Sequence, residues 1–212
     1  MAKIAKRRDE NAGPRRASSW SARKRILDVA EEMVARESPA DFQLQEVADR
    51  LGVKPPALYN HFRGREDLLQ QVDSRVADGY YAALEWTPGE DALTWLRGAA
   101  RRLVAYYSSR PAVARFTLWD LARGKLALPN DESRERFEDL VARVRSALSQ
   151  AAQNGEMRSI RPDAFLVTLT SSIAASVLWH EFCSDADVDL KHLEDEAESL
   201  VVRLLQPDSG SS

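Results

Sequence analysis

The chain has 212 residues, 44% of them hydrophobic, which is enough for one medium domain or for a small domain and a larger one. No apolar run of about 18 residues occurs and the N-terminal segment is polar, so neither a membrane span nor a signal peptide is predicted. The single cysteine, Cys183, excludes an intramolecular disulfide and fits a reducing cytoplasm.

The net charge of -3 is distributed unevenly along the chain. Residues 1–25 contain nine basic and two acidic side chains, a balance of +7, so residues 26–212 carry -10. A basic segment of this kind either contacts nucleic-acid phosphates or remains a solvated tail, and disordered arms can become ordered on binding. We predict a flexible basic arm over residues 1–20, and the acidic remainder would not bind DNA by itself.

Two helices are predicted after this arm. The first covers about residues 21–37, with Ser21 as its N-cap. Its apolar stripe consists of Ile26, Leu27, Val29, Ala30, Met33 and Val34. Phe42 is expected to enter the core just before the second helix, which spans Leu44–Leu51 and ends at Gly52.

A third, shorter helix is predicted over about Pro56–Phe62. Because proline disfavours the helical region for the preceding residue, Pro55 is placed at the cap and Pro56 at the first helical position. Leu58 and Phe62 are four residues apart and are assigned to the core. Two short amphipathic helices joined by a glycine-containing turn are typical of a helix-turn-helix, whose second helix enters the major groove of DNA.

The rest of the chain also shows helical periodicity and no convincing strand. The predicted helices cover about 65–84, 90–108, 111–123, 131–153, 162–182 and 190–206, with a break at Thr87-Pro88-Gly89. The predicted fold class is all-α. A three-helix DNA-binding domain over residues 21–66 precedes a larger helical domain over residues 67–206 and a polar tail over residues 207–212.

The segment LGVKPPALYNHFRGREDLL resembles the tetracycline-repressor (TetR) family of transcriptional regulators. The matching elements are the turn Leu51-Gly52-Val53, the run Leu58-Tyr59-Asn60-His61-Phe62 and the basic link Arg63-Gly64-Arg65. The likeness covers about residues 23–70. It implies about nine helices, a homodimer, a palindromic operator, and a C-terminal ligand pocket that changes the spacing of the two DNA-reading heads. Lys54 and the proline pair depart from the Ser or Thr that caps the third helix in many members.

The resemblance also assigns DNA contacts, with local packing or solvent exposure as the alternative for each. The Tyr59 hydroxyl and the His61 imidazole suit phosphates, and Asn60 suits a bidentate pair with adenine. Gln45 would reach a base and Gln43 a phosphate, while Arg65 resembles the family's phosphate clamp. The full predicted set is Gln43, Gln45, Lys54, Pro55, Pro56, Ala57, Tyr59, Asn60, His61 and Arg65.

The C-terminal part is rich in aromatic residues, which at helical spacing usually form a core. Small-molecule sites are mostly apolar with a few placed polar groups, and the predicted ligand-binding residues are Trp95, Tyr107, Phe116, Trp119, Thr170, Trp179 and His180. A metal site at His180, Glu181, Cys183 and Asp185 is not favoured because the spacing matches no recognised ligand pattern. No cofactor is predicted.

The last two helices are the predicted dimer surface, with burial inside one chain as the alternative. Small residues at Ser171, Ser172, Ala174, Ala175 and Ser176 permit close helix approach, and the last helix carries the stripe Leu193, Ala197, Leu200, Val201 and Leu204.

The predicted function is that of a cytoplasmic, ligand-responsive DNA-binding transcriptional regulator. The leading hypothesis is a repressor that binds a palindromic operator and is released from it by a small apolar or aromatic molecule. The alternatives are a DNA-binding regulator without small-molecule response, and an activator. An enzyme is not favoured because the sequence lacks a glycine-rich phosphate loop, a nucleophile elbow and a metal-binding helix motif.

Overall fold

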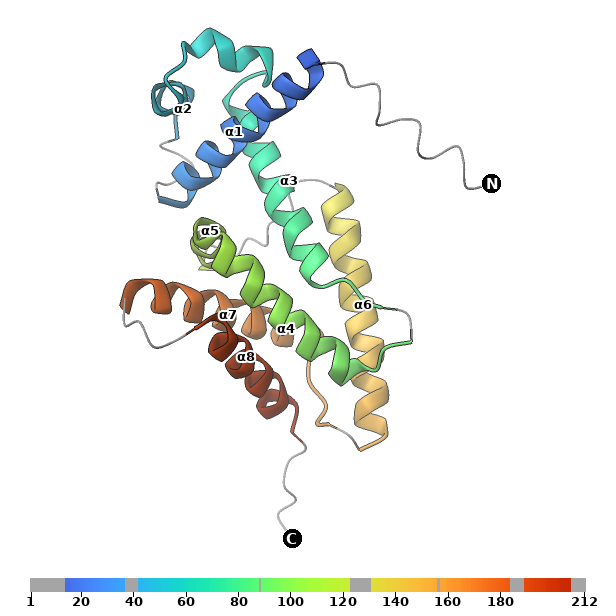
Figure 1. The fold of residues 1–212 in the computed structure, drawn as a ribbon. Coiled ribbons are helices and arrows are strands. Elements are labelled where there is room, and N and C mark those ends of the chain that lie inside the picture. The colour runs from blue at the N-terminus through green and yellow to red at the C-terminus, as the bar shows by residue number, and fades with distance from the viewer. Residues whose placement is uncertain are drawn as a thin grey trace. The chain divides into compact units, whose positions relative to one another are not determined.

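The computed structural model describes residues 14–36, 42–87, 89–122, 131–155, 157–183 and 189–206. Within these ranges every regular element is a helix, as Figure 1 shows, and the predicted all-α class is confirmed. The elements are α1 (Pro14–Arg36), α2 (Leu44–Leu51), the 3₁₀ helix η2 (Pro55–Asn60), α3 (Arg65–Ala83), α4 (Ala92–Ser109), α5 (Pro111–Ala122), α6 (Asp131–Gln153), α7 (Pro162–Cys183) and α8 (Leu190–Leu205).

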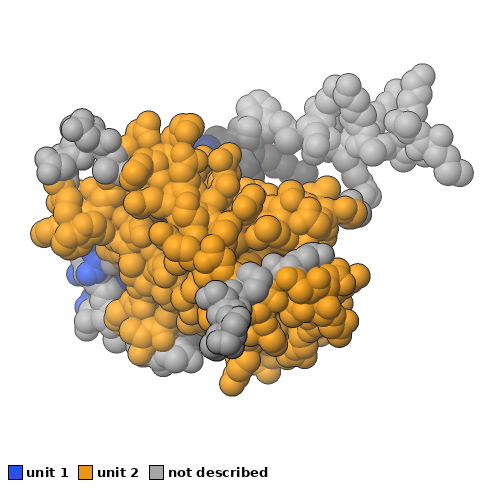
Figure 2. Space-filling model, turned by 90° about the horizontal axis from the view of Figure 1, so that it is seen from below, with its two compact units in different colours: residues 1–72 blue, residues 73–212 orange. Residues whose placement is uncertain are grey.

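The chain forms two compact units, residues 1–72 and residues 73–212, which Figure 2 colours separately. The division falls inside α3, six residues beyond the position 66 at which the sequence prediction ended the DNA-binding domain. The α3 helix itself runs without interruption from Arg65 to Ala83. Residues of both units are therefore carried on one helix.

The smaller unit has an apolar core to which each of its helices contributes. Leu58 and Phe62, which the sequence assigns to the core, are only 1% and 2% exposed. The other buried apolar side chains of this unit are Ile26, Leu27, Ala30, Met33, Val34, Phe42, Val47, Ala48, Leu68 and Val72. This list includes Phe42, the predicted anchor before α2, whereas Val29 of the predicted α1 stripe is only half-buried.

The first helix begins two turns earlier than predicted. It starts at Pro14, so the N-cap assignment of Ser21 is wrong and residues 14–20 of the predicted arm are helical. Proline is well tolerated in the first helical turn, where its missing N–H removes no hydrogen bond. No glycine or further proline occurs between Pro14 and Arg36 to interrupt the helix. Residues 1–13 of the predicted arm lie outside the described residues.

The turn after α2 confirms the predicted bounds of that helix. Gly52 has φ = 66°, the left-handed conformation that glycine adopts without a steric penalty. Its N–H donates to the Asp49 carbonyl at 3.1 Å, and the Val53 N–H donates to the Ala48 carbonyl at 3.0 Å. These two bonds satisfy carbonyls at the end of α2 and turn the chain sharply toward η2.

The entry into η2 differs from the prediction. Lys54 is the N-cap and both prolines lie inside the first turn, so the assignment of Pro55 as the cap is wrong. Neither proline removes a hydrogen bond there, because the first N–H groups of a helix have no acceptor within it. Ala57 has the first available N–H, and it donates to the Lys54 carbonyl three residues back at 2.9 Å. The 3₁₀ element ends at Asn60, two residues before the predicted Phe62.

The larger unit is organised around α4, which packs against α5, α6, α7 and α8. Seven residues of α4 are buried: Trp95, Leu96, Ala99, Ala100, Leu103, Val104 and Tyr107. The remaining helix bounds agree with the predictions to within two residues, and residues 123–130, between α5 and α6, lie outside the described residues. Among the described residues one helix, α7, is long and apolar enough to cross a membrane, but a core helix passes the same test.

A close approach between α3 and α4 requires glycine at position 79. The Tyr106 ring of α4 lies against Gly79, and its hydroxyl donates to the Val76 carbonyl at 3.1 Å. A Cβ atom added at Gly79 would lie 2.4 Å from Cε2 of Tyr106. The guanidinium of Arg110 lies 5.5 Å from the centre of the same ring, which limits how far the ring can retreat.

We therefore expect Gly79→Ala to destabilise the protein by about 1–3 kcal/mol through overpacking, although alanine is favoured by about 1 kcal/mol in a helix interior. Urea unfolding followed by circular dichroism measures the change. In a Tyr106→Ala background the ring is absent, so Gly79→Ala should instead be stabilising. A neutral effect of Gly79→Ala in the wild-type background would contradict the close approach.

Candidate functional site

The two predicted glutamines lie at the surface where α2 begins. Gln43 is the N-cap of α2, with extended backbone angles (φ = -126°, ψ = 139°) and no side-chain capping bond. Both glutamine side chains are exposed, and the Gln45 amide Nε2 donates to Oδ1 of Asp49 at 2.9 Å. Val47 and Ala48 on the opposite side of α2 are fully buried. The first turn of α2 therefore presents its polar side to solvent.

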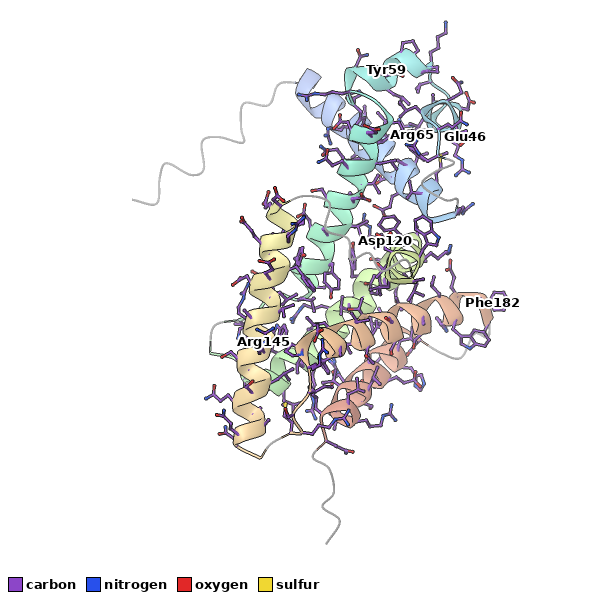
Figure 3. The ribbon with its side chains drawn as sticks, turned by 180° about the vertical axis from the view of Figure 1, so that it is seen from behind. Glu46, Tyr59, Arg65, Asp120, Arg145 and Phe182 are labelled. Carbon is purple, nitrogen blue, oxygen red and sulfur yellow. The ribbon has the colours of Figure 1, made fainter. Side chains whose placement is uncertain are left out.

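The 3₁₀ helix η2 buries a single side chain, Leu58, and turns the others outward to different degrees. Lys54, Pro56, Tyr59 and Asn60 are exposed. The remaining predicted contacts Pro55, Ala57 and His61 are partly exposed. Tyr59, labelled in Figure 3, is 59% exposed, which leaves a large aromatic ring in contact with water. The structure therefore brings all seven predicted residues from Lys54 to His61, Leu58 excluded, to an accessible surface.

Contacts with Phe62 hold η2 against the rest of the smaller unit. The Phe62 N–H donates to the Leu58 carbonyl at 3.0 Å, so the buried phenyl ring follows directly from the last turn of η2. The guanidinium of Arg23, from α1, lies over this ring at 4.7 Å from its centre. A cation at this distance from an aromatic face is attracted to it. Arg23 thus links α1 to the end of η2.

Arg65 has a structural partner that sequence reasoning missed. Its Nε donates to the carbonyl oxygen of Phe42 at 2.7 Å, which joins the start of α3 to the residue before α2. The carboxylate of Asp67 accepts from the Arg63 N–H at 2.7 Å. An acidic residue three positions after Gly64 at a helix start is a capping pattern that could have predicted the second bond. Nothing local in the sequence indicates the first, since its partners are 23 residues apart.

In the larger unit, four hydroxyl side chains from four helices lie close together in the interior. We call Tyr80 of α3, Tyr107 of α4, Thr117 of α5 and Thr170 of α7 the hydroxyl cluster. The hydroxyls of Tyr80 and Thr170 are hydrogen-bonded at 3.1 Å. The Thr117 hydroxyl lies close enough to Tyr107 to lower its pKa as a hydrogen-bond partner would, but the two oxygens do not meet the distance and angle of a hydrogen bond. Of the predicted ligand residues, Tyr107 and Thr170 belong to this cluster, whereas Tyr80 and Thr117 were missed.

Burial keeps these phenols protonated. It raises the pKa of Tyr107, and the nearby Tyr80 raises it further, while Thr117 acts in the opposite direction. Burial also raises the pKa of Tyr80, against the effect of its bond to Thr170. The neighbouring Tyr81 has its pKa raised to about 12 by burial and by Tyr80, although Arg136 opposes the shift. The cluster is therefore neutral at any physiological pH.

The other predicted ligand residues lie elsewhere. Trp95 is fully buried, stacks on Trp86 with ring centres 4.5 Å apart, and donates from Nε1 to the Glu85 carbonyl at 3.2 Å. Trp179 is 67% exposed, and its ring centre lies 6.0 Å from that of the exposed Phe182. Phe182 is labelled near the end of α7 in Figure 3. Phe116 is buried, and Trp119 and His180 are partly exposed. Trp95 thus contributes to the core and Trp179 to the surface.

The residues near His180 form no metal site within the described ranges. No group of three or more His, Cys, Asp or Glu side chains among the described residues is placed to hold an ion. Glu181 forms an ion pair with Arg115 of α5 at 2.9 Å instead. Cys183 is exposed, and Asp185 lies outside the described residues.

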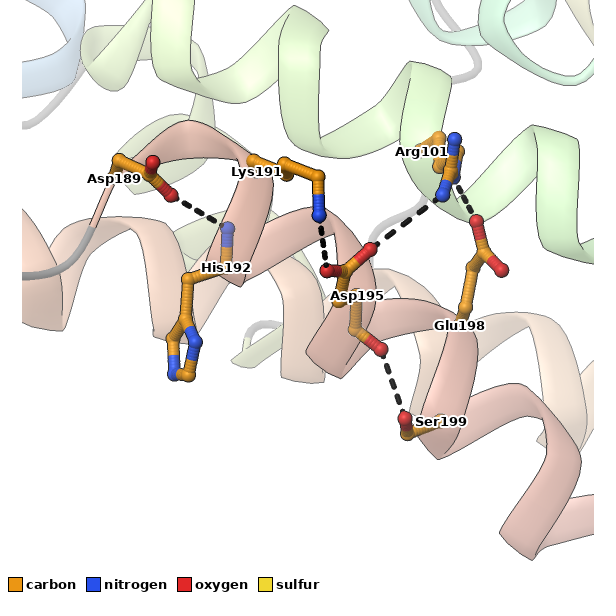
Figure 4. Close-up of polar contacts among 7 residues, drawn as sticks. All are labelled: Arg101, Asp189, Lys191, His192, Asp195, Glu198 and Ser199. Atoms are coloured by element: carbon orange, nitrogen blue, oxygen red, sulfur yellow. Dashed lines mark hydrogen bonds and ion pairs between the residues drawn. The ribbon is translucent and has the colours of Figure 1, made fainter.

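A groove of about 260 Å³ lies between α4, α7 and α8 and is lined in part by Ser172, Ser176 and Leu200. Leu193, Ala197 and Val201 of the predicted dimer stripe are buried within the chain itself. Beside the groove, Arg101 of α4 pairs with Glu198 and Asp195 of α8, and Lys191 pairs with Asp195 at 3.0 Å (Figure 4). Exposed pairs of this kind contribute little individually, but the two formed by Arg101 connect α4 to α8.

Comparison with known proteins agrees with the geometry of the smaller unit. Residues 26–72 match the sequence model described as bacterial regulatory proteins, tetR family. Over 158 residues the chain is 26% identical to the nucleoid occlusion factor SlmA of Idiomarina loihiensis, covering 72% of this chain and 79% of that protein.

Solved structures share the fold over most of the chain. A TetR family transcription regulator from Marinobacter aquaeolei superposes with a TM-score of 0.70 at 23% identity, over 91% of this chain and 100% of that one. The ketosteroid transcriptional regulator KstR2 of Mycobacterium tuberculosis gives a TM-score of 0.69 at 16% identity, over 88% of this chain and 96% of that one.

The raised tyrosine pKa values predict an alkaline titration that depends on folding. Unfolded tyrosines ionise near pH 10, so at pH values between about 10 and 12 the folded chain keeps protons that the unfolded chain has lost. Stability should therefore be unaffected below about pH 10 and should fall as the pH rises toward about 12. Absorbance at the tyrosinate band should be lower for native than for urea-unfolded protein in this pH range. Tyr81→Phe should reduce the rise in absorbance that the native protein shows near pH 12. Superimposable native and unfolded titration curves would contradict the assignment.

Proposed function

We propose that this chain, which belongs to the TetR family of DNA-binding transcription regulators, is a cytoplasmic repressor that binds a palindromic operator as a homodimer. A small apolar or aromatic molecule bound in the larger unit would release it from that operator. The observation that carries the DNA-binding part is the exposed face of η2, which lies within the residues that match the family model.

In this proposal η2 and the start of α2 contact DNA. The exposed Tyr59 hydroxyl and His61 contact phosphates, and Asn60 pairs with a base edge. Pro55, Pro56 and Ala57 offer apolar contact, for example to a thymine methyl group, while Lys54 and the two glutamines add polar contacts. Arg65 would add positive charge from a position that the Phe42 carbonyl holds fixed. Because η2 has only six residues, specificity would rely on phosphate positioning and dimer spacing as well as on bases.

The homodimer is supported by an apolar face of α7 that the chain itself leaves uncovered. Val167, Ala175, Trp179 and Phe182 are exposed and follow one another at helical spacing along α7. Phe182 is 79% exposed and Trp179 67%, and a contiguous apolar surface of this kind usually marks an interface. The small residues Ser172 and Ser176 at the adjacent groove would let a second copy's helices approach closely.

The alternative without ligand response also has an observation in its favour. The similar SlmA protein is named for nucleoid occlusion, not for a response to a small molecule. A regulator without a small-molecule response would stay on its DNA when small molecules are added, whereas a ligand-responsive repressor would be released by its effector. Operator binding measured with and without small apolar or aromatic molecules distinguishes the two functions. Activation in place of repression depends on where the operator lies relative to the promoter.

The DNA interface is tested with fragments that the wild-type protein selects from a random DNA pool. We expect the double variant Tyr59→Ala, His61→Ala to bind them at least about tenfold more weakly, because two contacts per subunit are lost. Arg145→Ala, which removes a charge from the exposed side of α6 (Figure 3), should bind like the wild type. Wild-type affinity should fall by about a thousandfold between 50 and 200 mM salt if about six or more phosphates are contacted. Retained affinity in the double variant, or a flat salt response, would refute the interface.

The dimer is tested with a charge placed on the uncovered face of α7. Ala175→Arg should convert the dimer to a monomer, because an arginine there would be buried without a partner in the interface. Ala142→Arg places the same substitution on the exposed side of α6 and should leave the dimer intact. Light scattering after size-exclusion chromatography reports the mass of each variant. Equal masses for both variants would rule out α7 as the interface.

A further inference from the structure

Tyr107 has a buried hydroxyl without a hydrogen-bond partner. The residue is 0% exposed, and its Oη has no partner at hydrogen-bond distance and angle, although the nearby Thr117 hydroxyl acts to lower its pKa. All five tyrosines of the chain lie in its described part, and the other three in the larger unit have partners. Tyr80 bonds to Thr170, Tyr81 donates to the Ser133 carbonyl at 2.9 Å, and Tyr106 donates to the Val76 carbonyl. Among them, Tyr107 alone keeps an unsatisfied polar atom in the core.

An unsatisfied buried hydroxyl destabilises a folded protein, because it has left water without gaining another partner. A phenylalanine at position 107 would fill almost the same space without this cost. The polar atom is therefore unexplained by the packing of α4 alone. Small-molecule sites, by contrast, are mostly apolar with a few placed polar groups, and such a group lacks its partner until the molecule arrives.

The surroundings of Tyr107 restrict which molecule could bind. The side chains that act on its hydroxyl electrostatically are Tyr80, Tyr106 and Thr117, and none of these carries a charge. Leu103, one turn before Tyr107 in α4, and Phe116, next to Thr117 in α5, are buried and apolar. A carboxylate or an ammonium group brought to this point would be a buried ion without a counter-ion. A hydroxyl or carbonyl group would pair with Tyr107 without that penalty.

The cluster is also not sealed on every side. Thr117 is partly exposed, and so is the Tyr80 residue, although the Tyr80 hydroxyl itself is enclosed. Four helices, α3, α4, α5 and α7, each contribute one hydroxyl group.

We propose that the Tyr107 hydroxyl is the polar anchor of the effector, and that the effector is an uncharged molecule with one hydroxyl or carbonyl group on an apolar frame. This inference rests on the ligand response proposed above, and it assigns the chemical class of the ligand. Tyr80, Thr117 and Thr170 form the polar wall around the anchored group. The apolar frame lies against the buried side chains of α4 and α5.

Two matched variants test the anchor without any ligand. Tyr107→Phe removes the unsatisfied hydroxyl and should raise the melting temperature of the ligand-free protein. Tyr106→Phe, one residue earlier, removes a hydroxyl that is already bonded to the Val76 carbonyl and should lower it. If Tyr107→Phe lowers the melting temperature as Tyr106→Phe does, the Tyr107 hydroxyl is already satisfied, for example by a buried water, and the proposal is wrong.

The ligand class is tested with 2-naphthol and 2-naphthoate as probes at millimolar concentration. We expect 2-naphthol to raise the wild-type melting temperature and 2-naphthoate to leave it unchanged. Tyr107→Phe should bind 2-naphthol about tenfold more weakly, the effect of one lost hydrogen bond, while Tyr106→Phe should bind it like the wild type. No shift with 2-naphthol, or an equal shift with 2-naphthoate, overturns the proposal.

Operator gel shifts separate this proposal from the function on which it rests. If a charged molecule releases the wild-type protein from DNA and Tyr107→Phe responds equally, the ligand response stands and the anchor is wrong. If DNA binding persists in the presence of 2-naphthol although that molecule binds at Tyr107, the anchor stands and the ligand response is wrong.

Discussion

The smaller unit depends on two buried side chains, Leu58 and Phe62, which fix a 3₁₀ helix that has little else to hold it. Six residues form too short a helix to be stable alone, since helix nucleation is unfavourable and few bonds follow it. Leu58 is the one side chain that η2 buries, and Phe62 follows it into the core beneath the Arg23 guanidinium. Every other side chain of η2 is thereby available to face a partner.

Much of this arrangement could be predicted because the determining signals are local. Gly52 ends α2 through its own left-handed conformation, and Pro111, Asp131 and Pro162 begin helices at the predicted positions. Prediction fails where two signals compete within a few residues. The polar sequence around Pro14 predicts a flexible arm, but this proline starts a helix. The restriction that Pro56 imposes on the preceding residue predicts Pro55 as a cap, but both prolines lie in the first turn of η2.

The contacts that could not be predicted join residues far apart in the sequence. The bond from Arg65 to the Phe42 carbonyl, and the one between Tyr80 and Thr170, connect positions separated by 23 and 90 residues. Hydrophobic periodicity identified the buried side of each helix but not which polar atom on one helix meets which atom on another. Likewise the periodicity of α7 marks it as apolar around its circumference. Only the packing shows that Thr170 lies inside and Trp179 outside.

The position of the hydroxyl cluster suggests how a bound molecule could influence DNA binding. The α3 helix carries Arg65 in the smaller unit and Tyr80, a member of the cluster, fifteen residues later in the larger one. A ligand shifts an equilibrium only if it interacts differently with two states of the protein. An uncharged ligand that separates the Tyr80 hydroxyl from the Thr170 hydroxyl would interact differently with the two states. Tyr80 lies on α3, the same helix whose Arg65 donates to the Phe42 carbonyl before α2. In this proposal, the continuous α3 helix is the physical link between the Tyr107 anchor and the proposed DNA-contacting face of η2.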